Sequence, residues 1–117
     1  NKKEIENMIY DGVVEIAPLS YMRGRTFKKA FIVADEMQNA TASQMKMLLT
    51  RIGERSQMVV TGDLHQADRM KNNGLLDFIK QLDSYHATKH IDIVRFSHND
   101  IERHQAVQEV LEIYGDD

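Results

Sequence analysis

The sequence contains no cysteine and only one proline, Pro18. A chain without cysteine can form neither disulfides nor thiolate metal sites, and secretion is not supported, so we expect a cytoplasmic protein. No apolar run approaches the roughly 20 residues that a membrane-spanning helix needs, and we therefore expect no membrane partner. The chain begins at Asn1 rather than methionine and shows no signal-peptide pattern, which suggests a processed or truncated start.

An excess of positive charge is also lacking, since 15 Lys and Arg stand against 18 Asp and Glu and give a net charge of −3. Any nucleic acid would have to be held by a local patch rather than by the whole surface. The composition is 42% hydrophobic and 28% charged, as in soluble globular proteins. A chain of 117 residues suffices for one modest core, so we expect a single domain over residues 1–117.

Apolar spacing predicts helices and strands in near alternation. Helices are expected over residues 3–10, 42–52, 75–82 and 99–114, and strands over residues 13–17, 30–34, 57–61 and 91–96. Thr41 and Gln44 have the spacing of a capping box at the start of the second helix. The apolar residues of 30–34 are continuous, which is typical of a strand buried on both faces. This order predicts an α/β fold with a parallel sheet.

Two of the expected strands end in polar residues. The second is followed by Asp35 and Glu36, and the third by Gly62 and Asp63, with Gln66 close behind. Functional residues gather at the carboxyl ends of strands in open parallel sheets, and Mg²⁺ is commonly bound through one or two carboxylates together with phosphate oxygens. Asp35 would then hold the ion and Glu36 would polarise a water molecule. Ordinary helix capping is an alternative explanation for an acid in this place.

The segments FIVADEMQNATASQMKMLLTRIG and SQMVVTGDLHQAD resemble the PhoH-like proteins, which are P-loop ATPases with a core related to superfamily 1 helicases. VVEIAPLSYMRGRTF and FSHNDIERHQAVQEVLEIY are similar to flanking parts of the same family. The resemblance implies a RecA-like nucleotide-binding fold, with Mg²⁺ and ATP as cofactors. It also implies work on RNA or single-stranded nucleic acid and ring-like homo-oligomers.

The resemblance assigns roles to seven residues, in two groups. The catalytic positions are Glu36, Asp35 and Gln66, with Asp35 also holding Mg²⁺ through water; the nucleotide-binding positions are Gln38, Gly62, Asp63 and Arg103. Asp35 and Glu36 correspond to the Walker B acids, and Arg103 would approach the γ-phosphate. Met37 replaces the alanine usual in the family, and Ala34 replaces a larger aliphatic residue.

The family's glycine-rich phosphate loop, G-x-x-x-x-G-K-[ST], does not occur in this sequence. That loop supplies the lysine and the Mg²⁺-binding hydroxyl of phosphoryl transfer. The chain therefore resembles the C-terminal part of an ATPase domain, without the P-loop strand and helix, and by itself we expect it to bind nucleotide weakly.

A cationic loop carries Arg23 and Arg25 around Gly24, with Tyr21 just before them. It could grip a nucleic-acid backbone while Tyr21 stacks on a base, supply an arginine finger to a neighbouring subunit, or be a solvated turn. Two alternatives to the ATPase stay open. One is a non-catalytic nucleic-acid-binding or assembly module, and the other is an Mg²⁺-dependent nuclease using Asp35, Glu36 and Asp63.

Overall fold

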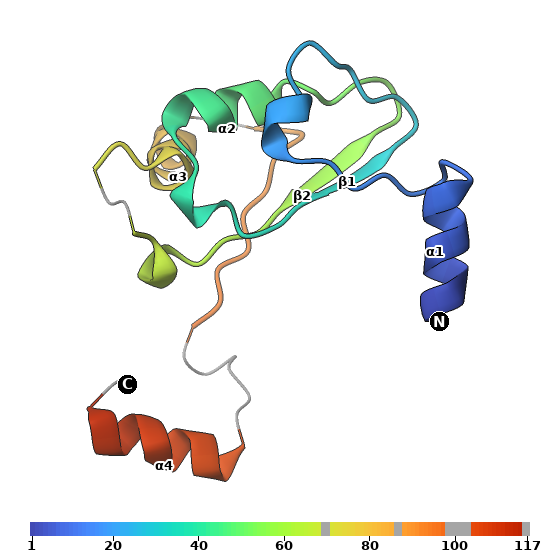
Figure 1. Ribbon diagram of the computed structural model, residues 1–117. Coiled ribbons are helices and arrows are strands. Elements are labelled where there is room, and N and C mark those ends of the chain that lie inside the picture. Colours follow the sequence, from blue (N-terminus) through green and yellow to red (C-terminus); the bar gives the residue numbers. More distant parts are fainter. Residues whose placement is uncertain (69–70, 86–87, 98–103, 116–117) are drawn as a thin grey trace. The chain divides into compact units, whose positions relative to one another are not determined.

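The computed structural model describes residues 1–68, 71–85, 88–97 and 104–115 (Figure 1). The chain divides into two compact units, Asn1–His86 and Ala87–Asp117, which are described separately here. The first unit contains the sheet and three of the α-helices, and the second contains α4. The predicted α/β class is confirmed.

The sheet consists of two parallel strands, β1 (Phe31–Ala34) and β2 (Gln57–Val60). Their register pairs Phe31 with Gln57 and Ala34 with Val60. Helix α2 (Ala42–Leu49) lies between the strands in the sequence and forms the crossover that a parallel pair needs. Because the strands are parallel, both carboxyl ends lie at one end of the sheet, where η2 (Met37–Asn39) and η3 (Leu64–Gln66) follow (Figure 1).

The core lies between one face of this sheet and the helices α2 and α3 (Gly74–Ser84). Met45 and Leu48 of α2 are the most deeply buried side chains, each 2% exposed. The opposite face is not covered in the part of the chain that the structure describes, since Phe31, Val33 and Val59 are exposed there. The prediction that the 30–34 strand is buried on both faces is therefore wrong, because α2 and α3 pack on one face only.

A local signal places the start of α2 correctly. Thr41 and Gln44 form the predicted capping box of α2, in which each side chain bonds the other residue's backbone N–H. The helix ends at Leu49, earlier than the expected residue 52, because Ile52 bridges to Phe27. The N–H of Gly53 in turn donates to the Phe27 carbonyl at 2.7 Å. The backbone of residues 52–53 therefore pairs with Phe27 instead of continuing helix α2.

Two of the four predicted strands are absent from the described residues. After α1 (Lys2–Tyr10), the N–H groups of Val13 and Val14 both donate to the Met8 carbonyl, at 2.9 and 3.1 Å. They terminate the helix, so residues 13–17 form no strand. Residues 91–96 pair with no described strand, and the Ile93 N–H donates to the Asp92 side chain at 2.9 Å. Both segments are rich in apolar residues, as the prediction requires. These backbone hydrogen bonds go to residues nearby in the sequence, so neither segment pairs as a strand in the described part of the chain.

The second unit contains α4 (Gln105–Tyr114), which begins six residues later than predicted. The His104 ring accepts from the Ala106 N–H, and Gly115 ends the helix at φ 75° as expected. Residues 99–103, which we expected to be helical, lie outside the described residues. The apolar stripe of α4 is exposed at Val107 and Val110. In the described part of the chain, no helix is long and apolar enough to cross a membrane.

Replacing Leu48 by alanine tests the placement of the core. We expect Leu48→Ala to lower the free energy of unfolding by about 2–5 kcal/mol, because it leaves a cavity under the sheet. The measurement is urea denaturation followed by circular dichroism. Ile5→Ala, on the exposed face of α1, is the matched control and should change stability by less than about 0.5 kcal/mol. Equal losses in the two variants would contradict this core.

Candidate functional site

The predicted acids follow β1 directly and are bonded to the residue that follows β2. The Thr61 N–H donates to the Ala34 carbonyl at 2.9 Å, which extends the parallel pairing by one step. The Thr61 hydroxyl donates to Asp35 Oδ1 at 2.5 Å and accepts the Glu36 N–H at 3.2 Å. One hydroxyl therefore fixes both acids relative to β2.

Glu36 has a left-handed backbone, with φ 58° and ψ 48°. A side chain other than glycine in this region costs on the order of 1 kcal/mol, so the surrounding bonds must enforce it. The Met37 N–H, which donates to the Thr61 carbonyl at 2.8 Å, is one of these bonds. The turn directs the chain into η2 while leaving the Glu36 side chain exposed. Strain of this kind is commonly found at functional sites.

Gln38 is the central side chain of the site and is buried, with 6% of it exposed. Its Nε2 donates to Glu36 Oε2 at 2.8 Å, while its Oε1 accepts the Asp63 N–H at 3.3 Å. Because a backbone N–H can only donate, the bond from Asp63 fixes which end of the amide faces Glu36. Gln38 thus links the turn after β1 to the turn after β2.

Asn73 holds the backbone of Gln38 in place through a side-chain hydrogen bond. Its side chain is buried; its Nδ2 donates to the Gln38 carbonyl, and its Oδ1 accepts the Leu76 N–H at 3.0 Å. The second bond makes Asn73 the N-cap of α3. Asn73 therefore connects the start of α3 to η2, the turn after β1. The turn that carries the acid pair is thus bonded to the residue after β2 and to the N-cap of α3.

Gly62 is required by close packing rather than by its backbone angles. A Cβ atom at this position would lie 2.5 Å from Leu75 Cδ2 and 3.2 Å from the Gln38 nitrogen. No side chain fits without moving Gln38. The glycine therefore lets the turn after β2 approach η2 closely enough for the bond between Gln38 and Asp63.

Asp63 and Gln66 are bonded to each other. Gln66 Nε2 donates to Asp63 Oδ2 and the His65 N–H donates to Asp63 Oδ1, both at 2.9 Å. Asp63 is therefore the N-cap of η3, and both of its carboxylate oxygens have protein partners. The structure brings six of the predicted residues to this end of the sheet; they are Asp35, Glu36, Gln38, Gly62, Asp63 and Gln66.

Asp35 and Glu36 fit the donor chemistry of Mg²⁺. Both are exposed, and neither Asp35 Oδ2 nor Glu36 Oε1 bonds to any residue that the structure describes. Two free carboxylate oxygens are hard ligands that can share an ion with phosphate and water. Among the described residues, no three His, Asp or Glu side chains gather as a metal cluster.

The cationic loop lies before β1, away from the acid pair in the sequence and at the other end of the strand. Arg25 donates to both carboxylate oxygens of Glu15, at 2.7 and 2.9 Å, and lies 4.6 Å from the centre of the Phe27 ring. The hydrogen bonds from Arg25 hold the pKa of the Glu15 carboxyl below its usual range. Arg25 is thus already engaged, whereas Arg23 is exposed and has no bond to any described residue.

Two residues of the site were not singled out from the sequence, and one predicted residue cannot be placed. Thr61 was read only as the end of a strand, and Asn73 was not noticed, although an Asn before an apolar helical run is an N-cap signal. Arg103 lies outside the described residues. Its predicted role at the γ-phosphate stays a prediction.

Comparison with known proteins shows the family of this chain. Residues 1–115 match the family described as PhoH-like protein. The chain belongs to the PhoH-like family. It is 44% identical over 116 residues to a PhoH-like protein of Mycobacterium bovis, covering 95% of this chain and 31% of that protein.

Two further PhoH-family relatives are similarly close. The chain is 45% identical over 106 residues to protein PhoH of Escherichia coli, covering 89% of this chain and 29% of that protein. It is 40% identical over 114 residues to a PhoH-like protein of Bacillus subtilis, covering 93% of this chain and 34% of the relative. The chain thus spans about a third of the length of the PhoH-like relatives that it matches.

Substituting Asn73 tests the support beneath the site. Asn73→Ala removes the cap of α3 and leaves the buried Gln38 carbonyl without its donor, and we expect a loss of about 1–3 kcal/mol in the free energy of unfolding. Asn73→Ser keeps an oxygen for the cap but is too short to reach Gln38, so it should lose less. Urea denaturation measures both. A neutral Asn73→Ala would contradict this role.

Proposed function

We propose that this PhoH-like chain supplies the Walker B and sensor half of a cytoplasmic, Mg²⁺-dependent ATPase that acts on RNA or single-stranded nucleic acid. The observation that carries the proposal is the acid pair at the end of β1, fixed by Thr61 and Gln38 with one oxygen of each acid free. Positioning a nucleotide phosphate requires side chains that are held in a fixed direction, as these two carboxylates are.

The role of each acid follows from the carboxylate oxygen that it leaves without a hydrogen bond to a described residue. Asp35 would hold a hydrated Mg²⁺ ion, which when bound neutralises charge on the phosphate oxygens. Glu36, whose Oε1 is free, would orient the attacking water and take its proton. Gln38 fixes the other oxygen of Glu36, so the carboxylate keeps one direction. Glycine-rich loop residues, which this sequence does not contain, would complete the site in the complete protein.

The nucleic-acid part of the proposal has a separate basis. Arg23 and Tyr21 are both exposed, and neither side chain bonds to a described residue, so both side chains are available to a phosphate and a base. The same arginine could act as a finger on a neighbouring subunit of a homo-oligomeric ring. The non-catalytic binding module is the second candidate, and the exposed Arg23 and Tyr21 side chains support it equally. Under that alternative, the Glu36 carboxylate has no chemical role.

The substitution Glu36→Gln separates these two candidates. In a full-length protein that contains the phosphate loop, we expect Glu36→Gln to lower ATP turnover at least about 100-fold while the Kd for ATP changes little. The amide keeps the size of the side chain but cannot accept the proton. Steady-state phosphate release and nucleotide titration measure the two effects. Glu54→Gln, on an exposed turn, is the control; wild-type turnover in Glu36→Gln would contradict the catalytic role.

The substitution Thr61→Val tests how the acids are held. Valine has the shape of threonine, but it leaves Asp35 Oδ1 and the Glu36 N–H without their shared partner. We expect kcat to fall about 10-fold or more with KM little changed, and Thr61→Ser to restore most of it. A serine variant as inactive as the valine variant would show that the methyl group, not the hydroxyl, matters at this position.

A further inference from the structure

The opposite end of the sheet, where both strands begin, is built around a second pair of backbone segments. Residues 27–30 and 51–56 lead into β1 and β2 and are joined by hydrogen bonds of 2.7 to 3.0 Å. The Phe27 N–H donates to the Arg51 carbonyl, and the Lys29 N–H donates to the Glu54 carbonyl. These segments lie away from the turns that hold the acid pair (Figure 1).

The pairing is interrupted between these segments and the strands. Phe27 bridges to Ile52, but four residues later Phe31 pairs with Gln57, so the second segment contains one residue more. The Ser56 hydroxyl fills the interruption, because it donates to the Phe27 carbonyl at 2.7 Å and accepts the Ala30 N–H at 3.1 Å. The bulge is therefore fully bonded and held in one conformation.

Both segments carry a cationic residue with left-handed backbone angles at this bulge. Lys29 has φ 52° and Arg55 has φ 57°, a region that favours glycine and asparagine. Their charges make at most one weak, exposed ion pair. Lys29 has no side-chain bond to a described residue, and the nearest acid to Arg55 is Glu54 at 3.9 Å, with both side chains at least 70% exposed.

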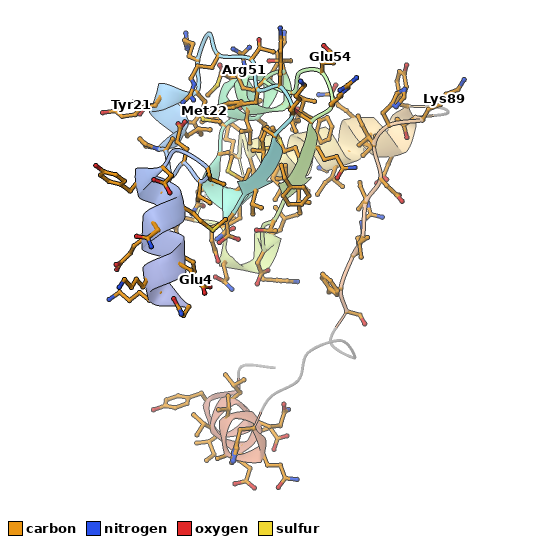
Figure 2. All side chains as sticks on the ribbon, turned by 90° about the vertical axis from the view of Figure 1, so that its right-hand side faces the viewer. Glu4, Tyr21, Met22, Arg51, Glu54 and Lys89 are labelled. Carbon is orange, nitrogen blue, oxygen red and sulfur yellow. The ribbon has the colours of Figure 1, made fainter. Side chains whose placement is uncertain are left out.

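Two more cations lie on the same segments, Lys28 and Arg51. We call Lys28, Lys29, Arg51 and Arg55 the basic platform. With Glu54 as the only acid within residues 27–30 and 51–56, four positive charges and one negative charge give +3, in a chain whose net charge is −3. Figure 2 shows Arg51 and Glu54 at the same edge of the first unit. These two segments thus carry a local excess of positive charge at the end of the sheet where the strands begin.

We propose that the basic platform binds the phosphodiester backbone of a single-stranded nucleic acid. The bonded bulge fixes the backbone that carries the cations, and Lys28 and Lys29 have no side-chain bond to a described residue that a phosphate would have to displace. Arg55 has only an exposed ion pair with Glu54 at 3.9 Å, which contributes little binding free energy. Arg51 donates to the Met47 carbonyl and the Thr50 hydroxyl, which holds its guanidinium group in place. Tyr21 and Phe31, which are 70% and 66% exposed, flank the platform in the sequence and offer ring faces for bases. Exposed aromatic rings beside cations favour a nucleic acid over an acidic peptide. The inference rests on the nucleic-acid part of the proposed function.

The test measures binding of a fluorescein-labelled single-stranded RNA 20-mer to the 117-residue chain by anisotropy at several salt concentrations. The platform variant is Lys28→Gln with Lys29→Asn and Arg55→Asn, since asparagine suits the left-handed positions and should preserve the fold. The control variant is Lys2→Gln with Lys3→Gln and Lys80→Gln, which removes the same charge from α1 and α3. Thermal unfolding by circular dichroism checks that both variants are folded.

We expect the platform variant to raise the Kd at least about tenfold at low salt and to reduce the slope of log K against log salt by about two. The control variant should change the Kd less than about threefold. The charge-preserving exchange Lys29→Arg with Arg55→Lys should bind like the wild type, which separates charge from backbone effects.

Four results would overturn the inference. Equal losses in platform and control variants would mean that only net charge matters. An unchanged platform variant, with binding lost in Arg23→Ala, would move the contact to the Arg23 loop and leave the nucleic-acid function standing. Tighter binding of a labelled poly-glutamate peptide than of RNA would indicate a protein partner. No RNA binding at low salt would reject the platform and the nucleic-acid function together, while the ATPase proposal keeps its own test at Glu36.

Discussion

The parallel pairing of β1 and β2 is the constraint on which the rest of the first unit depends. It brings the residues after both strands to one end of the sheet, where Thr61 continues the ladder with the Ala34 carbonyl. Beyond this point the contacts involve a side chain, because the Thr61 hydroxyl donates to the Asp35 carboxylate and accepts the Glu36 N–H. The left-handed turn at Glu36 persists because these bonds and the burial of Gln38 stabilise it.

The two ends of this small sheet have different chemistry. At the carboxyl ends, polar side chains bond to one another and leave two carboxylate oxygens free. At the amino ends, a bonded bulge presents Lys29 and Arg55, and of these two cations only Arg55 has an acidic neighbour, Glu54. The two ends are separated by the length of the strands, so under the two proposals a nucleotide and a polynucleotide would be held at different ends of the sheet.

The elements that the sequence predicted correctly are those with short-range signals. The capping box at Thr41, the glycine stop of α4 and the two strands ahead of the polar turns depend on neighbouring residues. The two strand predictions that were wrong, at 13–17 and 91–96, rested on apolar content alone, and strands form only where a partner offers backbone bonds. The acids and Gln38 were identifiable from their motif. Thr61 and Asn73 were missed because their importance lies in bonds to residues 25 or more positions away.

The central claim is that the turns after β1 and β2 form one site for a metal-bound phosphate. It is tested most directly by adding Mn²⁺ with ATP to the ¹⁵N-labelled chain and measuring the paramagnetic broadening of each amide signal, which detects weak binding. The account predicts that amides of residues 35–38 and 61–63 broaden first, while those of residues 28–29 and 54–55 and of α1 stay sharp. Broadening that spreads evenly over exposed acids such as Glu6 and Asp11, or that leaves residues 35–38 unchanged, would contradict it.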